Sequence, residues 1–425
     1  MAPINLDSEN DSDKLTSLAV VFPLVLVGFV IAAGCWTIFA VAGAHLRNTL
    51  GLGSLEFGFL LAMPMAAGAL LAVPAGIAAY KLGPRRVMIA CLLGLVGSML
   101  LLMVAESWPG YLLGAGGLGL AGGFYSAGLQ FVTLNAPARH LGCVLGIFGA
   151  GVTGAGFNYY LVPLILQAFS WKGVPLAYLI VLLLVTLLFL LLTEDPDAGA
   201  DSDIDSGVRP LLKLIENLRD WRYGLYFGAI AGSFFSLALW LPDFMSSRFL
   251  LTMESGARLA LWFVIPGAMA QVIGGALADR CDASRVVIHS LRVCLAALFV
   301  LSYPPMTLFV RGTESEIALD FALPLFLEGV FIVLLGLSLG ASMGALQRMV
   351  IGRNREAVAF IAGFLLSNAC LFAFLQPVLF GAMIDWTGVG TAMFMIPFLL
   401  LSVSLLMFAH DVRREERQLL LHKGV

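Results

Sequence analysis

Long apolar stretches separated by short polar ones dominate the pattern of positions along the chain. Each stretch is about 20 residues long and does not alternate between polar and apolar positions, which favours membrane-spanning helices over barrel strands. The first six expected spans are 18–43, 57–79, 87–105, 109–134, 142–168 and 174–193. The second six are 223–246, 257–278, 286–309, 322–346, 357–382 and 391–409. We therefore expect an all-α polytopic membrane protein with twelve transmembrane helices.

Polar segments divide this pattern into domains. Residues 1–17 are polar and acidic and lack the basic start of a secretory signal, so we expect a disordered tail. An N-terminal bundle (18–193), a linker (194–222), a C-terminal bundle (223–409) and a second tail (410–425) follow. Within the linker, residues 208–221 place their apolar positions on one helical face, which predicts a short amphipathic helix on the membrane surface.

Composition and charge narrow the class of protein further. The 425 residues are 60% hydrophobic and 12% charged, whereas a soluble domain has roughly 25% charged residues. A net charge of −3 gives no reason to expect nucleic-acid binding. The six cysteines are scattered without a CxxC pair, which argues against a disulfide framework or a zinc site. No nucleophile–base set, phosphate-binding loop or cofactor motif is present, so we expect neither an enzyme nor a cofactor.

Lysine and arginine are distributed unequally between alternate loops. If the N-terminus is cytoplasmic, the inner loops and tails carry far more of these residues than the outer loops. The positive-inside rule then predicts that both termini are cytoplasmic.

A glycine ladder fills the expected span at 142–168. On a helix its small residues form two stripes, because residues three and four apart share a face. The first stripe is Gly142, Gly146, Gly149, Thr153 and Gly156, and the second is Gly151, Gly154 and Asn158. We expect this helix to pack closely against neighbours on two sides, and its glycines to permit sliding between helices.

The two halves of the chain repeat each other. Residues 76–86 (GIAAYKLGPRR) follow the second span, and residues 275–285 (GALADRCDASR) follow the eighth. The later copy contains Asp279, Arg280 and Arg285, and it resembles the loop motif of the major facilitator superfamily. The earlier copy departs from the motif, because Tyr80 stands where the acid belongs. The resemblance implies two pseudo-symmetric six-helix bundles and a central site near the bilayer midplane.

Within that superfamily, residues 122–165 and 265–280 are similar to helices of the nitrate/nitrite porter family. The shared features are the glycine ladder, the proline near the helix end, and the double glycine before Ala-Leu-Ala-Asp-Arg. The resemblance implies a secondary transporter of a small solute that works by alternating access.

The functional positions of that family are only partly kept. The family holds its anion between two arginines, and their positions fall on Ala72 and Gln271. Its ladder asparagine falls on Val152, while its sandwiching aromatics fall on Tyr125 and Met343. A bare oxyanion in the membrane interior needs fixed positive charge, which arginine supplies through paired donors. We therefore expect a porter scaffold that does not carry nitrate by the family mechanism.

Few polar groups remain inside the spans as candidates to bind a solute. Amides at mid-span are costly in lipid and should face a partner helix or water. The candidates are Tyr125, Gln130, Asn158, Gln271, Met343, Asn368 and Gln376. Glu328 is the candidate for proton coupling, because such coupling commonly uses a buried carboxylate. No group of residues has metal-ligand spacing, so we expect no resident metal.

Two other functions stay open from the sequence. Nitrate-porter-like facilitators include a branch in magnetosome membranes that is associated with iron supply for biomineralization, and the overall resemblance is compatible with it. A non-transporting scaffold or sensor on the same fold is the third reading. We expect a monomeric unit whose partners are a small solute and the lipid of a bacterial inner membrane or a magnetosome membrane.

Overall fold

The computed structural model of the chain describes residues 7–193, 218–311, 316–354 and 357–422. The elements of the first half are α1 (Asp7–Trp36), α2 (Phe39–Leu50), α3 (Ser54–Leu82), α4 (Pro84–Val104), α5 (Trp108–Gly117), α6 (Leu120–Asn135), η1 (Ala138–His140), α7 (Leu141–Gly149), η2 (Ala150–Val152) and α8 (Thr153–Leu192). Those of the second half are α10 (Leu218–Arg248), α11 (Met253–Arg280), α12 (Ala283–Leu301), β1 (Met306–Arg311), β2 (Glu316–Phe321), α13 (Leu325–Arg353), α14 (Val358–Thr387) and α15 (Ala392–His422).

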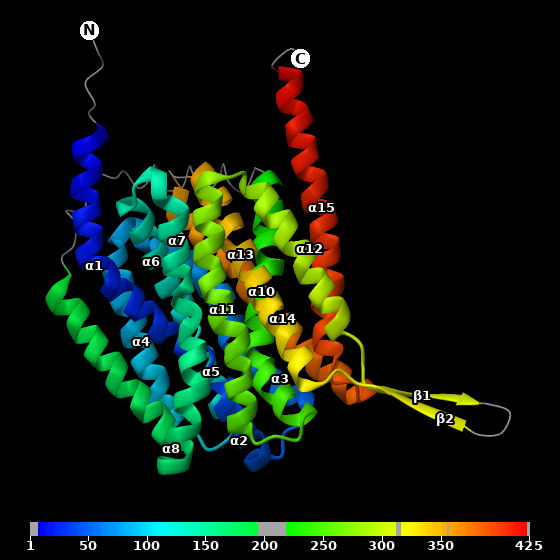
Figure 1. Ribbon diagram of the computed structural model, residues 1–425. Helices are drawn as coiled ribbons and strands as arrows, with labels where there is room; N and C mark the ends of the chain where they lie inside the picture. The colour runs from blue at the N-terminus through cyan, green and yellow to red at the C-terminus, as the bar shows by residue number, and fades with distance from the viewer. Residues whose placement is uncertain (1–6, 194–217, 312–315, 355–356, 423–425) are drawn as a thin grey trace, which may run out of the picture.

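The predicted all-α membrane fold is confirmed. Among the described residues, eleven helical stretches are long and apolar enough to cross a membrane. One of them, Ala138–Leu192, has 55 residues and contains two of the expected spans. Ser170 interrupts it with φ 61°, and the chain reverses direction there (Figure 1). Helix α8 packs on α1 and α4 of the N-terminal bundle.

The first half of the chain forms one helical bundle and the second half forms the other. Across their interface α3 packs on α14, and α7 and α8 pack on α11. Within the C-terminal bundle, α11 packs extensively on α13, and α10 packs on α14. The contacts of α3 with α14, and of α7 and α8 with α11, form the interface in which the central polar residues described below lie.

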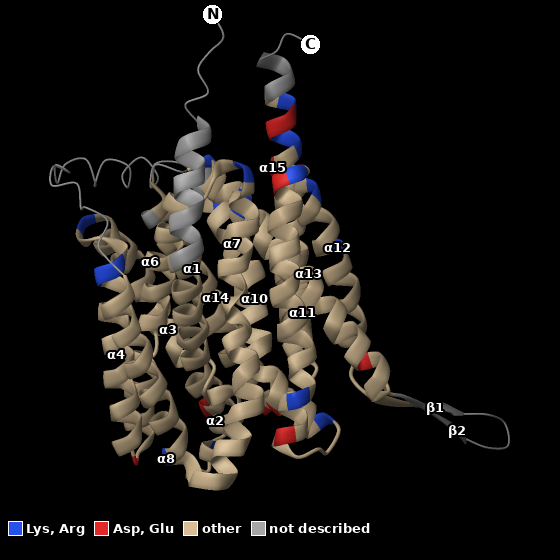
Figure 2. Cartoon of the chain, turned by 60° about the vertical axis from the view of Figure 1, so that its left-hand side comes forward, with Lys and Arg blue, Asp and Glu red and all other residues tan. Residues whose placement is uncertain are grey.

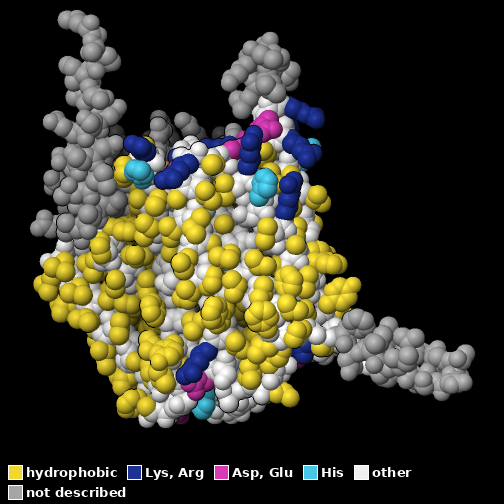
Figure 3. All heavy atoms as spheres, in the orientation of Figure 1, with side chains coloured by type: hydrophobic (Ala, Val, Ile, Leu, Met, Phe, Trp, Pro, Cys, Tyr) yellow, Lys and Arg dark blue, Asp and Glu magenta, His cyan; other side chains and the backbone are white. Residues whose placement is uncertain are grey.

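The bundle has two distinct ends. Helix α1 begins and α15 ends on one side, which we call the terminal face (Figure 1). The α2–α3 and α10–α11 turns lie on the other side, the distal face. In the described chain, lysine, arginine and acidic residues gather toward these two faces (Figure 2). A broad belt of apolar side chains lies between them (Figure 3), as a helix bundle that crosses a bilayer requires.

The structure corrects three expected boundaries. The span expected at 286–309 ends at Leu301, because Pro304 and Pro305 prevent the helix from continuing. Strands β1 and β2 follow as an antiparallel hairpin, with Met306 opposite Phe321, which we did not expect. Residues 7–17, expected as disordered tail, belong to α1. Residues 218–222 of the expected linker belong to α10, while the rest of the expected linker helix lies outside the described residues.

Candidate functional site

The first glycine stripe lies against α11 of the other bundle. A Cβ on Gly142 would collide with the carbonyl oxygen of Gly275, and a Cβ on Gly146 would lie 2.8 Å from that of Gln271. A Cβ on Gly149 would collide with the amide nitrogen of Gln271, and one on Gly156 would lie 2.8 Å from Ile265. These glycines let the two bundles approach to backbone contact.

The second stripe lies against α1 of its own bundle. A Cβ on Gly151 would collide with Phe29, and one on Gly154 with the carbonyl oxygen of Val30. Asn158 donates from Nδ2 to the carbonyl oxygen of Gly34 at 2.6 Å and to Thr37 Oγ1 at 2.9 Å, and it accepts from Tyr178. This stripe therefore holds the N-terminal bundle together.

A chain of three polar side chains crosses the interface at the centre. Gln347 of α13 is fully buried, and its Nε2 donates to the hydroxyl of Tyr125 on α6 at 2.9 Å. Gln271 of α11 donates from Nε2 to Gln347 Oε1 at 3.4 Å. Gly149 leaves the space that the Gln271 amide occupies. Met343 is also buried and precedes Gln347 by one helical turn on α13.

Aromatic rings surround this polar chain. The Phe29 ring centroid lies 5.0 Å from that of Tyr125 and 5.0 Å from that of Phe148. Trp36 of α1 meets Phe235 of α10 across the interface at 6.0 Å. The indole nitrogen of Trp36 is buried and has no hydrogen-bond partner among the described residues. The centre thus offers neutral donors and aromatic faces.

Positive charge is held away from this centre. Arg348 follows Gln347 directly in α13, but its Nε donates to Asp279 Oδ1 at 2.6 Å on the terminal face. Ala72 and Gln271, which we matched to the family's arginine positions by resemblance, are both buried. In the part of the chain that the structure describes, no lysine or arginine side chain joins the polar chain.

The remaining polar candidates lie inside single bundles. Gln376 of α14 donates to Ser233 Oγ of α10 at 3.2 Å, whereas Asn368 donates within α14 to the carbonyl oxygen of Phe364 at 2.8 Å. Gln130 follows Gly123 by two helical turns, and Gly123 faces α3 and α4. Of the seven candidates, the structure therefore brings Tyr125, Gln271 and Met343 together at the centre.

The terminal face closes the interface through Asp279. Its carboxylate accepts from the backbone N–H groups of Gly142 and Cys143 at 2.9 Å each, at the start of α7, as well as from Arg348. The Asp279 side chain is 7% exposed. Arg285 instead makes an exposed pair with Asp282 at 3.8 Å. Arg280, the last residue of α11, makes no ion pair within 4.0 Å in the described chain.

The distal face closes the same interface with different residues. Asp385, at the end of α14, accepts from the backbone N–H of Leu55 at 3.0 Å, at the start of α3. Arg47 pairs with Asp243 at 3.3 Å between α2 and α10. A Cβ on Gly58 would lie 2.6 Å from the carbonyl oxygen of Pro377, so backbone contact occurs here too. The centre is therefore enclosed from both faces.

Glu328 lies in the first turn of α13 near the distal face and is 3% exposed. Its carboxylate makes no hydrogen bond or ion pair with another described residue, although it lies near enough to Arg248 for their charges to interact. It is separated along α13 from Gln347 by five helical turns. The structure thus places the coupling candidate away from the polar chain.

Sequence reasoning missed Gln347, Trp36, and the distal pairs of Asp385 and Arg47. Gln347 could have been found, because it is an amide inside an apolar span, one turn after Met343. The others gave no comparable signal, since they lie at expected helix ends or carry an indole that is ordinary in membrane helices. Among the described residues, no group of three or more His, Cys, Asp or Glu is placed to hold a metal ion.

Comparisons with known proteins agree with this architecture. A family profile described as Major Facilitator Superfamily matches residues 24–351. The chain is 26% identical over 397 residues to the probable nitrate/nitrite antiporter NarK1 of Thermus thermophilus, covering 90% of this chain and 89% of that protein. It is 23% identical over 281 residues to the nitrite extrusion protein of Bacillus subtilis, covering 66% and 69%.

Solved structures show the same fold at low sequence identity. The human organic anion transporter MFSD10 (TETRAN) aligns with a TM-score of 0.65 and 16% identity over 90% of this chain and 99% of that one. A bacterial homologue of the human lysosomal transporter Spinster aligns with a TM-score of 0.66 and 14% identity, over 93% and 97%. The chain therefore belongs to the Major Facilitator Superfamily and is similar in sequence to its nitrate/nitrite porters.

Proposed function

We propose that the protein is a secondary transporter that moves a small solute by alternating access between its two bundles. The observation that carries this proposal is the polar chain of Tyr125, Gln347 and Gln271, which joins α6, α13 and α11 at the centre of the interface. Closures at both faces flank it, so opening one closure at a time would expose the centre to one side of the membrane.

The chemistry of the centre favours a solute that does not need a pair of guanidinium groups. Nitrate in a dry interior requires offsetting positive charge, and Arg348 is already paired with Asp279. Neutral amides, a phenol and an indole instead suit a neutral solute with hydrogen-bonding groups. We infer that nitrate is not carried by the two-arginine mechanism of the similar porters.

We propose the same orientation and the same coupling residue that the sequence led us to expect. The terminal face carries most of the basic loop residues, so we assign it and both termini to the cytoplasmic side of a bacterial inner membrane. Glu328 is our candidate for proton coupling, supported by the burial of a carboxylate that has no hydrogen-bonding partner in the described chain. Its distance along α13 from the centre requires that it act through movement of that helix.

A counterflow panel in proteoliposomes tests the function. The solutes are nitrate, nitrite, ferrous iron, a ferric chelate, and the neutral solutes urea and glycerol. We expect exchange of a neutral solute, at least roughly tenfold slower in Gln347→Leu, because a buried amide network would be broken. Gln167→Leu is the matched control, since the Gln167 amide is exposed and donates to Glu254 at 3.0 Å on the distal face, away from the central polar chain.

Each result separates the open readings. Exchange of nitrate by the unaltered protein contradicts the proposed solute class, and exchange of iron favours the magnetosome reading. Exchange of no solute contradicts transport and favours a scaffold or sensor. Ala72→Arg combined with Gln271→Arg should create nitrate exchange if the scaffold retains the porter geometry, provided that the doubly substituted protein elutes as a folded monomer.

A further inference from the structure

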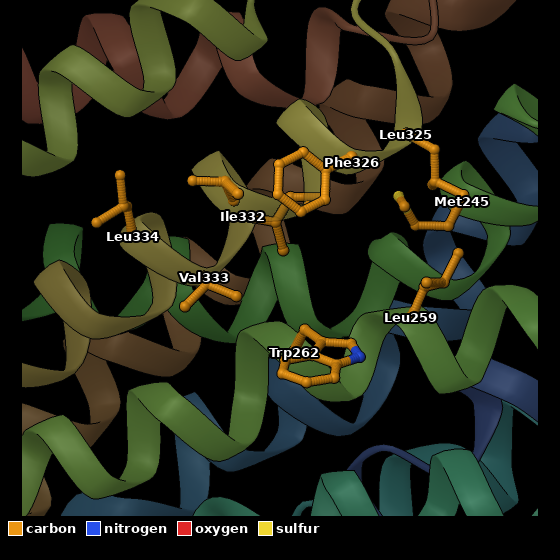
Figure 4. Close-up of a pocket in the computed structure, with 10 residues that line it drawn as sticks. Met245, Leu259, Trp262, Leu325, Phe326, Ile332, Val333 and Leu334 are labelled. Atoms are coloured by element: carbon orange, nitrogen blue, oxygen red, sulfur yellow. The ribbon is translucent and has the colours of Figure 1, made fainter.

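An apolar pocket opens on the outside of the C-terminal bundle, between α10, α11 and α13 toward the distal face. Its volume is about 530 Å³, within the range of roughly 300–1,000 Å³ that ligand pockets occupy. Figure 4 shows Trp262 of α11 across the space from Phe326 and Ile332 of α13. Trp262 is 62% exposed and Phe326 is 79% exposed, so the pocket opens outward, away from the interface between the bundles.

The pocket faces the lipid that surrounds the bundle. It lies within helices that cross the apolar belt, where the surrounding medium is lipid hydrocarbon. Ten residues line it, and all of them are apolar except for the indole N–H of Trp262. A linear hydrocarbon chain fits such a lining, because it makes van der Waals contacts with apolar side chains and needs no hydrogen-bond partners.

One arginine, Arg248, lies close to the pocket along α10. Arg248 follows the lining residue Met245 by three positions on α10, so both lie on one face of the helix. Its guanidinium lies 5.3 Å from the ring centroid of Phe249 and makes no ion pair within 4.0 Å in the described chain. The Glu328 carboxylate is near but belongs to a side chain that is 3% exposed.

The other arginine of this region is already engaged. Arg258 pairs with Glu254 and lies 5.9 Å from the ring centroid of Tyr160. Arg248 differs from Arg258 because its guanidinium makes no ion pair within 4.0 Å in the described chain. The paired N–H donors of a guanidinium match the oxygens of a phosphate diester.

We propose that this pocket binds one phospholipid of the distal leaflet, with an acyl chain between α11 and α13 and the phosphate on Arg248. The site is separate from the central polar chain, and it does not depend on which solute is transported. It differs from the general lipid shell in retaining its lipid when the surrounding bilayer is removed.

A pocket-filling variant and a matched control separate this site from general lipid contact. Gly329 lines the pocket, and a Cβ placed on it meets no atom within 4 Å. The first atom of a new side chain therefore has room, and Gly329→Phe places a ring in the pocket. Gly97 on α4 also has nothing within 4 Å of an added Cβ, and it lies in the other bundle. Gly97→Phe adds the same ring away from the pocket.

The test is native mass spectrometry of the full chain released from nanodiscs of phosphatidylethanolamine and phosphatidylglycerol. We expect one retained phospholipid per chain, lost in Gly329→Phe and kept in Gly97→Phe. Arg248→Gln should weaken retention roughly tenfold, while Arg258→Gln should not. In the intact bilayer, lipids with brominated acyl chains should quench fluorescence that is lost in Trp262→Phe, and Gly329→Phe should reduce that quenching.

Three results would overturn the proposal. They are equal lipid retention in Gly329→Phe and the unaltered protein, equal losses in Gly329→Phe and Gly97→Phe, and dimer formation through this face in place of a bound lipid.

Discussion

The two closures of the interface use the same device with different degrees of burial. On each face, a carboxylate from the end of a C-terminal-bundle helix accepts from the backbone N–H groups that begin an N-terminal-bundle helix. Asp279 on the terminal face is 7% exposed and accepts three hydrogen bonds, one of them from Arg348. Asp385 on the distal face is exposed to solvent; it accepts from the backbone N–H of Leu55 and is also hydrogen-bonded by Ser54.

This difference indicates which face opens at the lower cost. A hydrogen-bonded carboxylate in a buried site is costly to leave unpaired, whereas exposed ionic contacts are screened by water and salt. The nearby Arg47–Asp243 pair is likewise partly exposed, at 28% and 17%. We therefore expect the distal face to open more readily than the terminal face, and the following substitutions test that order.

The largest effect is expected from Asp279→Asn. This change removes the charge that faces Arg348 and weakens both bonds to the start of α7. We expect the terminal closure to lose about 2 kcal/mol, which changes the closed-to-open ratio roughly thirtyfold. Spin labels on the exposed native Cys281 and on Arg139→Cys should report longer distances across the terminal face.

The control for this measurement lies on the other face. Spin labels at Lys172→Cys and Trp386→Cys report on the distal face, where the native Trp386 is 86% exposed. The distance between these two labels should not increase in Asp279→Asn. Cys143 and, for the distal pair, Cys281 are replaced beforehand. Terminal-face distances that match the unaltered protein would contradict the assignment of Asp279 as the main closure.

A smaller effect on the same face is expected from Gly275→Ala. The added Cβ would collide with the carbonyl oxygen of Gly142, which is backbone and cannot rotate away. The bundles must separate locally, so the terminal labels should move apart without any change in charge. The increase in the terminal-face distance in Gly275→Ala should therefore be the same at low and high salt. A salt-dependent increase would show that backbone contact is not its cause.

Asp385→Asn should have a still smaller effect, on the distal face. The carboxylate is exposed, so water competes for its hydrogen bonds to Ser54 and Leu55 at the start of α3, and the closed-to-open ratio should change only about twofold. The distal labels should report this change, and it should diminish further at high salt. An effect as large as that of Asp279→Asn would reverse the order proposed for the two closures.

The sequence predicted the fold because its evidence is local and repeated. Apolar runs of span length, interrupted at polar turns, indicate helices irrespective of what lies next to them. The glycine ladder predicted close packing, since glycine in a membrane helix has few other uses. The hairpin after α12 was missed because its residues are apolar enough to extend a span, and only Pro304 and Pro305 signal its end.

The candidate site was less predictable because it depends on pairing between distant helices. Gln271 and Tyr125 were singled out by resemblance, but their partner Gln347 is 76 and 222 residues away from them in the chain. Asn158 and Gln376 have the same composition signal, yet they bond within single bundles. Sequence spacing cannot distinguish these cases, since helix rotation and tertiary contact decide which amides meet.

The smallest effect is expected from Arg285→Gln. This substitution compares two residues of one loop motif, the buried Asp279 and the exposed Arg285. Asp279 and Arg285 belong to the same loop motif, but Arg285 is 79% exposed and lies 3.8 Å from Asp282, three residues away on its own helix end. An exposed pair of this kind contributes roughly 0–1 kcal/mol, and no hydrogen bond among the described residues joins it to the other bundle. Distances across both faces, as well as transport rate, should therefore match those of the unaltered protein. A shift approaching that of Asp279→Asn would mean that the motif acts through its overall charge, and that the burial of Asp279 is not what closes the terminal face.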